Sequence, residues 1–165
     1  MRHHLPPFDP PFSVVLVHPQ IPPNTGNVAR LCAVTGCRLH LVEPLGFSIA
    51  DKDLRRAGLD YWDEVVARIH PSLEAWEETI DPERIHLFTG RGTTCLWETR
   101  FRPGDHLVFG SEQKGLPEEL LQRYPQRTVA IPQRSGLRSL NLSTSVGIAV
   151  YEALRQGMAA IRGAS

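Results

Sequence analysis

The chain carries no excess of either charge and has few cysteines. Its 165 residues include 18 basic and 18 acidic side chains, so the formal net charge is +0. A neutral total argues against a protein that wraps nucleic acid non-specifically, although a local basic patch, or a dimer that pools two patches, stays possible. The three cysteines form no CxxC pair, which is typical of reduced thiols in a cytosolic protein. The histidines are scattered without zinc-ligand spacing, so we expect no metal site.

Long apolar runs are also missing. No run approaches the roughly 18 apolar residues of a membrane-spanning helix, and the first residues contain no apolar signal core. We therefore expect a cytoplasmic protein without membrane contact. Apolar residues make up 41% and charged residues 22% of the chain, which is ordinary globular composition, and the length fits one domain.

Several common catalytic motifs are absent. The sequence has no GxxxxGKS or GxxxxGKT phosphate-binding loop and no GxSxG nucleophile elbow. Residues 89–95 begin like a dinucleotide-binding fingerprint, but Cys95 stands where the third glycine belongs. These absences count against a P-loop enzyme, a serine hydrolase of that type and an NAD-dependent enzyme.

What the chain does contain is an alternation of short apolar runs and helix-like stretches. This alternation predicts an α/β fold with a mostly parallel sheet and helices on both faces. Residues 1–12 contain four prolines and are expected to form an irregular extension outside the fold, followed by a single domain at 13–160. Strands are expected at 13–17, 39–43, 64–69, 84–88, 106–109 and 128–131, and helices at 24–35, 51–57, 72–79, 117–123 and 142–160.

The first of three unusual loops leads from the first strand into a helix. Asn24 is a good candidate for the N-cap of this helix, and Gly36 suits its end. Asn27 and Arg30 are three residues apart and therefore project from the same side of the helix. Backbone N–H groups at the helix start and the guanidinium of Arg30 would attract a phosphate. Taken alone, a capped helix with a surface arginine is the commoner interpretation.

The second loop, residues 109–117, joins a strand to a helix that begins at Pro117. Gly110 and Gly115 bracket a short polar turn and would let the backbone approach a ligand closely. Glu112 could accept hydrogen bonds from a ribose or hold a basic neighbour in place. A simple connection between strand and helix explains this loop equally well.

The third loop, residues 131–143, is thirteen residues long and precedes the longest helix. Loops of this length in a compact domain are usually functional or disordered. Arg134 and Arg138 could reach phosphates, and Ser139, Asn141 and Ser143 offer short polar side chains near the helix start. A well-capped helix would explain Asn141 or Ser143, but not the whole array.

Together the three loops resemble the SPOUT superfamily, the knotted methyltransferases that use S-adenosyl-L-methionine. The 2′-O-ribose branch of that superfamily carries, in order, the motifs N-T-G-N-x-x-R, G-x-E-x-x-G-(L/I)-P, and I-P followed by S-(L/M)-N-(L/V)-S. This chain matches them at residues 24–30, 110–117, 131–132 and 139–143. The resemblance extends over roughly residues 13–158, which is nearly the whole domain.

The resemblance implies a fold, an assembly and a cofactor site. It implies a deep C-terminal trefoil knot, which pattern reading alone would not suggest because knots are rare. It implies a homodimer with its cofactor sites near the interface, and conversion of S-adenosyl-L-methionine to S-adenosyl-L-homocysteine. By motif position, backbone groups of the three loops would bind this cofactor, at Phe88, Thr89, Gly90, Gly110, Gly115, Ile131, Ser139 and Leu140.

The resemblance also implies roles for polar residues. Arg30 matches the arginine that the family uses in catalysis, and Asn27, Glu112, Ser139 and Asn141 would position the ribose or Arg30. Because a guanidinium keeps its proton in proteins, we expect Arg30 to hold the adjacent phosphate and stabilise the developing alkoxide. His18 is the other candidate base, although a lone histidine is more often structural. RNA contacts are expected from Asn24, Arg30 and Arg138.

A narrower resemblance points to the substrate. Residues 43–47 and 54–61 are similar to the compact members that modify the wobble nucleotide, position 34, of tRNA, and this chain likewise lacks an added RNA-binding domain. Thr144 stands where close relatives often have Asn. Tyr61 and Trp62 could stack on bases or pack in the core, and Arg55 and Arg56 fit an ordinary solvated helix face. The alternatives are 2′-O-methylation at another tRNA or rRNA site and a non-catalytic RNA-binding module.

Overall fold

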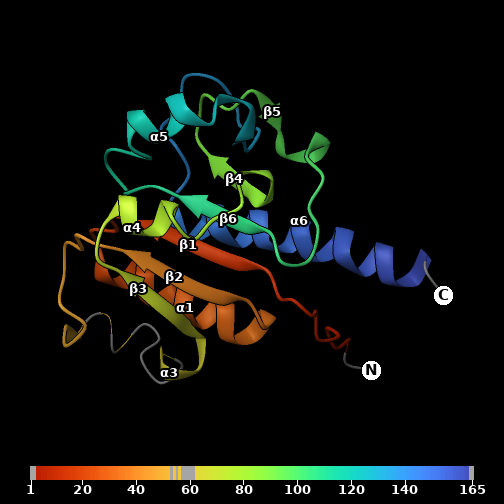
Figure 1. The fold of residues 1–165 in the computed structure, drawn as a ribbon, viewed down its shortest axis with the longest axis horizontal. Coiled ribbons are helices and arrows are strands. Elements are labelled where there is room, and N and C mark those ends of the chain that lie inside the picture. The colour runs from red at the N-terminus through yellow and green to blue at the C-terminus, as the bar shows by residue number, and fades with distance from the viewer. Residues whose placement is uncertain (1–2, 53, 55, 57–61, 164–165) are drawn as a thin grey trace.

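The structure is a computed structural model that describes residues 3–52, 54, 56 and 62–163. A seven-stranded sheet in the order β3-β2-β1-β6-β4-β7-β5 forms its centre, and every strand pair in the described part of the chain is parallel. Figure 1 shows the sheet flanked by helices, with α6 as the longest element. The strands are β1 (Ser13–Val17), β2 (Arg38–Val42), β3 (Val66–His70), β4 (Ile85–Phe88), β5 (Thr94–Cys95), β6 (His106–Phe109) and β7 (Thr128–Ala130). The principal helices are α1 (Pro22–Thr35), α3 (Trp62–Val65), α4 (Leu73–Glu77), α5 (Glu118–Arg123) and α6 (Leu142–Gly163).

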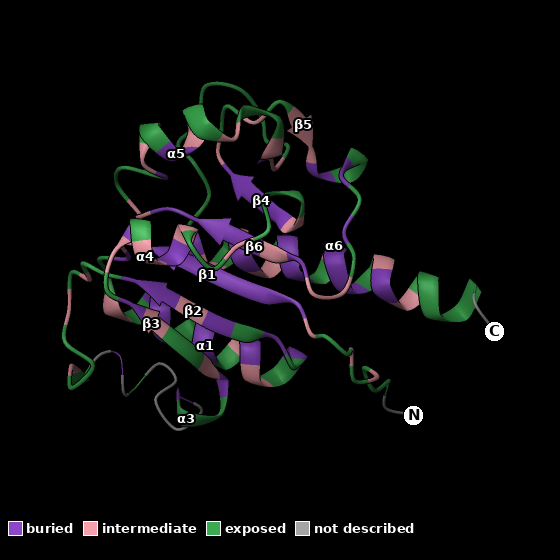
Figure 2. Ribbon diagram, viewed as in Figure 1, coloured by how far each residue is buried: buried purple, intermediate pink, exposed green. Residues whose placement is uncertain are grey.

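Helices cover both faces of the sheet, as the alternation predicted. Val14 and Leu16 of β1 belong to a core cluster that includes residues of α1 and α6. Val15 and Val17 belong to a second cluster with residues of α4 and α5. Neighbouring residues of a strand point to opposite faces, so β1 is buried throughout, as Figure 2 shows. The prediction of a mostly parallel α/β sheet is confirmed.

The strand order brings three loops together. β6, β4 and β7 are adjacent in the sheet although other elements separate them in sequence. All three run in the same direction, so the segments that follow Phe88, Phe109 and Ala130 leave the sheet at one edge. This edge is where ligands bind in open parallel sheets.

Several element boundaries differ from the predicted ones. Helix α1 begins at Pro22 and its N-cap is Ile21, so Asn24 is not the N-cap but lies inside the first turn. Proline is favoured at the first helical positions, which explains the earlier start. Gly36 ends α1 in the left-handed conformation with φ 76°, as predicted. The two-residue strand β5 was not predicted, and α6 continues to Gly163. Part of the helix expected at 51–57 lies outside the described residues, as do Arg55 and Tyr61.

The proline-rich N-terminal segment packs against the domain. Residues 3–12 have no helix or strand, in agreement with an irregular course. Contrary to the expectation that this segment lies outside the fold, Phe12 is 1% exposed and Phe8 packs against the same core cluster. The two rings meet edge to face at 5.7 Å. A Cβ at Gly157 of α6 would lie 2.8 Å from the Phe8 ring, so a glycine permits this close packing.

No helix among the described residues is both long and apolar enough to cross a bilayer. No group of three or more His, Cys, Asp or Glu side chains in the same residues is arranged to hold a metal ion.

Candidate active site

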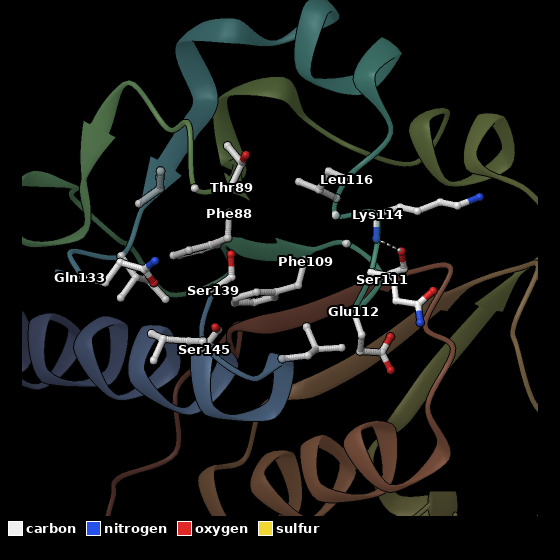
Figure 3. A pocket seen from close by; sticks show the side chains of 18 residues that line it. Phe88, Thr89, Phe109, Ser111, Glu112, Lys114, Leu116, Gln133, Ser139 and Ser145 are labelled. Carbon is white, nitrogen blue, oxygen red and sulfur yellow. Dashed lines mark hydrogen bonds between the residues drawn. The ribbon is translucent and has the colours of Figure 1, made fainter. Parts of the chain in front are cut away.

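A pocket of about 360 Å³ opens at the carboxyl ends of β4, β6 and β7. Figure 3 shows that side chains from several segments surround it, with Ser145 approaching from α6. All eight residues that the motifs assigned to a cofactor lie in its lining, namely Phe88, Thr89, Gly90, Gly110, Gly115, Ile131, Ser139 and Leu140. Glu112 lines it as well. The fold therefore assembles one cavity from residues that are far apart in sequence.

The loop after β6 is a tight turn that depends on two glycines. Ser111 and Gly115 exchange backbone hydrogen bonds of 3.3 and 2.9 Å, which closes the turn. Gly115 has φ 68°, in the left-handed region that glycine adopts at no steric cost. A Cβ at Gly110 would lie 1.9 Å from the carbonyl carbon of Gly115 and would collide with backbone. The shape of this wall is thus fixed by the absence of side chains at both positions.

Two aromatic rings form the apolar base of the pocket. Phe88 and Phe109 stack with their centroids 4.6 Å apart and an interplanar angle of 10°. Both are largely buried, at 7% and 3% exposure. Polar groups of Thr89, Gln133 and Ser139 border the same space. An apolar base with a few polar groups at its rim is typical of a small-molecule site.

Glu112 fastens the β6 loop to the start of α1. Its carboxylate accepts hydrogen bonds from the backbone N–H groups of Gln20, at 2.9 Å, and Ile21, at 2.6 Å. The side chain of Asn24 donates a third, at 3.2 Å. A carboxylate is stabilised at this end of a helix, where N–H groups lack partners and the helix dipole is positive. Glu112 is therefore held by the protein itself and positions the loop relative to α1.

Asn24 and Asn141 extend this connection to α6. The amide of Asn141 donates to the Asn24 side-chain oxygen at 3.1 Å. The Asn141 side-chain oxygen accepts from the Thr144 N–H at 3.3 Å and from the Ser143 hydroxyl at 2.7 Å. Asn141 thus caps α6, because it occupies a donor of the first turn. The chain Glu112–Asn24–Asn141, called the amide network below, joins all three motif loops.

Arg30 and Asn27 lie on the exposed side of α1, as their three-residue spacing predicted. Neither residue lines the pocket. Within the described part of the chain, neither side chain has a hydrogen-bond or ion-pair partner, so both are available to a ligand or a second subunit. Arg138 is also exposed and outside the pocket lining. Asn24 and Asn141 are likewise not part of the pocket wall.

His18, directly after β1, has an unusual backbone conformation. Its φ of 56° is the only positive value at a non-glycine residue in the described chain. Its Nδ1 is buried without a hydrogen-bond partner among those residues. Left-handed residues that are not glycine are uncommon, although histidine adopts this region more readily than most. His18 does not line the pocket, so the structure gives no support to a role as a base.

Three histidines, His40, His70 and His106, form a separate group called the histidine cluster. His40 Nδ1 lies 3.1 Å from His70 Nε2, and the two rings stack at 5.3 Å. The His106 ring lies 5.7 Å from that of His40. Burial, followed by the neighbouring His106 and His70, lowers the pKa of His40 to about 4. Burial is also the main cause that lowers the pKa of His70 and His106. The cluster therefore favours neutral imidazoles.

Some lining residues were not predicted from sequence. Phe109 and Leu116 lie within the second loop, Gln133 lies within the third, and Val129 belongs to β7; none of them had been assigned to the site. Ser145 follows Leu142 by three residues on α6, and both line the pocket. Helical spacing would have placed Ser145 on the same face as Leu142, so a signal for it existed.

The sequence as a whole matches a family model described as the SpoU rRNA Methylase family, over residues 11–151. The chain belongs to this family. A relative in Burkholderia ambifaria named tRNA (cytidine(34)-2'-O)-methyltransferase is 53% identical over 148 residues, which cover 88% of this chain and 95% of the relative. The resemblance inferred from the three motifs is therefore confirmed.

Solved structures agree with this assignment. A structure described as "Structural insights into the 2-OH methylation of C/U34 on tRNA" superposes with a TM-score of 0.82 at 49% identity, covering 88% of this chain and 95% of the other. The SpoU methyltransferase AviRb from Streptomyces viridochromogenes in complex with the cofactor AdoMet has a TM-score of 0.78 at 22% identity, over 93% of this chain and 60% of that chain. The second likeness, at that identity, concerns the fold alone.

Proposed function

We propose that this protein transfers a methyl group from S-adenosyl-L-methionine to the ribose 2′-hydroxyl of the wobble nucleotide, position 34, of a tRNA. The observation that carries the proposal is the convergence of the motif loops on one pocket, in a chain about half identical to a tRNA (cytidine(34)-2'-O)-methyltransferase over nearly its whole length. A cytoplasmic location, where tRNA is found, remains the corresponding expectation.

The pocket fits the proposed cofactor in size and in chemistry. Its volume of about 360 Å³ lies within the usual range for small-molecule sites. Gly90, Gly110 and Gly115 leave backbone groups accessible on its walls, and Phe88 and Phe109 offer an apolar base for a planar ring system. When bound, the sulfonium cofactor supplies an already activated methyl group and leaves as S-adenosyl-L-homocysteine. The protein then has mainly to align the ribose hydroxyl and assist its loss of a proton.

We assign that alignment to Arg30 and the residues around it. The unpaired guanidinium of Arg30 would hold the phosphate beside the target ribose and stabilise the oxygen as negative charge develops. Asn27, on the same face of α1, would share in contacts to the ribose, as would Ser139 in the pocket wall. Glu112, Asn24 and Asn141 act as positioning residues through the amide network. Arg138 would contact an RNA phosphate.

The proposal includes a homodimer and a C-terminal trefoil knot. Ile148 and Tyr151 are 39% and 51% exposed on α6, and a second copy would cover such apolar surface. Arg30 lies outside the pocket lining, which fits a site completed at a subunit interface. Leu142 and Ser145 bring the first turn of α6 against the pocket loops, which fits a helix threaded near them. Sedimentation analysis would measure the mass of the assembly.

The decisive experiment incubates the protein with tRNA and S-adenosyl-L-methionine labelled in its methyl group, followed by digestion of the RNA to nucleosides. We expect label only in a 2′-O-methylated nucleoside. A matched tRNA with a 2′-deoxyribose at position 34 should accept no label. Label in a base, transfer to the deoxy control, or no transfer to any tRNA would contradict the proposal.

Replacement of Arg30 separates chemistry from cofactor binding. Arg30→Ala should lower methyl transfer by at least about 100-fold, the effect typical of losing a group that stabilises developing charge. S-adenosyl-L-methionine should bind with unchanged affinity in calorimetry, because Arg30 lies outside the pocket lining. Arg30→Lys keeps the charge but not the planar donor geometry and should recover only part of the rate. Wild-type turnover in Arg30→Ala would remove this residue from the mechanism.

A further inference from the structure

Trp97 is an exposed tryptophan that the proposed reaction does not use. Its side chain is 73% exposed, whereas Trp62 and Trp76 are 8% and 1% exposed. A tryptophan ring carries a large apolar area, and leaving it in water forgoes the stabilisation of burial. Tryptophan is enriched at binding interfaces, where a partner covers the apolar ring.

The turn that carries Trp97 is firmly held. Residues Leu96–Glu98 form a 3-10 turn directly after β5, and Leu96 is buried at 1% exposure. Thr99 closes the turn, with its hydroxyl donating to the Cys95 carbonyl at 2.9 Å and its N–H to the Leu96 carbonyl at 3.2 Å. The side chain of Gln156 on α6 donates to the Thr99 carbonyl at 2.9 Å. The ring is therefore presented by an ordered turn.

The register of the sheet places this turn beside the third motif loop. β5 pairs with β7 through Thr94 with Val129 and Cys95 with Ala130. The two strands end beside each other at Cys95 and Ala130, so the Trp97 turn and the third motif loop leave the sheet at neighbouring positions. Ile131, the first residue of that loop, lines the pocket. β5 is the edge strand, two positions from β4, so Thr94, which the register places level with Phe88 through Val129, lies about 10 Å from it. Trp97 follows Thr94 by three residues. Figure 1 shows β5 at this outer edge.

The neighbouring loop supplies cations and another exposed apolar group. Leu137 is 70% exposed, and Arg134 and Arg138 are exposed on either side of it. Arg100 follows the Trp97 turn and is also exposed. Within the described residues, none of these three arginines has an ion-pair or hydrogen-bond partner. Glu98 is the one acid on the turn itself. We call Trp97, Arg100, Arg134, Leu137 and Arg138 the Trp97 surface.

We propose that the Trp97 surface binds the RNA strand that adjoins the target nucleotide, with Trp97 stacking on a flanking base and Arg134 and Arg138 contacting phosphates. An aromatic platform among unpaired arginines is the combination that single-stranded RNA favours, because every base has a stacking face and every nucleotide carries a phosphate. A chain with no net charge needs such a local basic site to hold an RNA substrate. The inference rests on the proposed function, since it concerns the same RNA.

The first experiment compares Trp97→Ala, Trp97→Phe and a control, Val34→Ala. Val34 is 65% exposed on α1 and is not part of the Trp97 surface. Loss of one stacking partner should raise the KM for tRNA by about 5- to 150-fold in Trp97→Ala. Trp97→Phe should recover most of the affinity, and Val34→Ala should behave as wild type. Affinity for S-adenosyl-L-methionine should be unchanged in all three. A wild-type KM in Trp97→Ala, or no recovery in Trp97→Phe, would overturn the proposal.

The second experiment uses the ring as its own probe. Because Trp62 and Trp76 are buried, the fluorescence that acrylamide quenches in the wild type should come mainly from Trp97. An RNA stem-loop with the anticodon sequence should shield Trp97 from acrylamide, and a blunt RNA duplex of equal length should not. Shielding that depends on protein concentration without RNA would assign the surface to a second copy of the chain and refute the RNA contact. Equal shielding by the duplex would also refute it.

The two proposals fail in different ways. If the wild type methylates tRNA but neither Trp97→Ala nor the stem-loop has the expected effect, the Trp97 surface is refuted and the proposed function stands. If the stem-loop shields Trp97 but no methyl group reaches any tRNA, the surface is supported and the proposed reaction is refuted.

Discussion

Replacing Gly110 with alanine should disable the pocket while leaving most of the fold intact. The new Cβ would lie 1.9 Å from the carbonyl carbon of Gly115 and 2.1 Å from the Leu116 nitrogen. Both contacts are with backbone, so no side chain can rotate away. The two ends of the β6 loop would have to separate by about 1.5 Å to restore ordinary contact. Forcing extra atoms into a packed region costs about 1–3 kcal/mol.

That cost should appear mainly as lost cofactor affinity, because the displaced segments are walls of the pocket. We expect S-adenosyl-L-methionine to bind about 5- to 150-fold more weakly in calorimetry. Gly147→Ala is the matched control. A Cβ at Gly147 meets no atom within 4 Å, and alanine is the better helix former by about 1 kcal/mol. Wild-type affinity in Gly110→Ala would show that the loop does not form the cofactor wall and would refute this reasoning.

Three further predictions concern the frame around the site. Glu112→Ala leaves the backbone N–H groups of Gln20 and Ile21 unpaired, so it should lower the free energy of unfolding in urea by about 1–3 kcal/mol and slow methyl transfer. The control Glu118→Ala removes an exposed ion pair and should lower that free energy by less than about 1 kcal/mol. Equal losses in the two variants would contradict the role of Glu112 in joining the β6 loop to α1. The pKa of His40 in the folded protein is lowered from 6.5 to about 4, so the unfolded chain takes up a proton first as the pH falls. The contribution of neutral His40 to the free energy of unfolding is therefore complete above pH 6.5 and is lost between pH 6.5 and 4, by at most about 3 kcal/mol. His40→Asn should flatten the dependence of unfolding free energy on pH in that window, and an unchanged slope would rule out this role. Phe12→Ala should lower the free energy of unfolding by about 3–5 kcal/mol because the ring is buried, whereas Leu5→Ala, at an exposed residue, should change it little. Equal melting temperatures of the two variants would show that Phe12 does not anchor the N-terminal segment.

Local pattern was sufficient for most of the fold. The six strands other than β5 overlap the strands predicted from sequence, and β1 and β6 begin and end at the predicted residues. Gly36 at the end of α1 and Pro117 ahead of α5 are local signals, because glycine adopts the left-handed conformation of a helix end and proline is favoured at a helix start. β5 was not predicted because a strand of two residues is too short to show the alternation of apolar and polar side chains. It forms only by pairing with β7, some 35 residues away in the sequence.

For the candidate site, too, the sequence predicted some residues, and others became apparent only in the structure. All eight residues that the resemblance assigned to the cofactor line the pocket, and the three glycines among them would let backbone approach a ligand closely. The motifs did not indicate which polar residues face the pocket. Asn24 was predicted to cap α1 but lies inside its first turn. Its hydrogen bonds to Glu112 and to Asn141 in the amide network were not predicted. These partners lie 88 and 117 residues apart, a distance over which sequence pattern carries no signal.

By itself, then, the sequence determined the parallel α/β class and the motif loops, because apolar periodicity and turn chemistry act over a few residues. The order of the three motifs, through their resemblance to known proteins, indicated the family. Tertiary structure alone decided that β6, β4 and β7 are neighbours and so joined their loops into one pocket. It also decided that Glu112 binds the start of α1, that Arg30 and Trp97 remain in solvent, and that Phe12 enters the core. Each of these depends on contacts between segments distant in the chain, which only the packed sheet and its helices bring together.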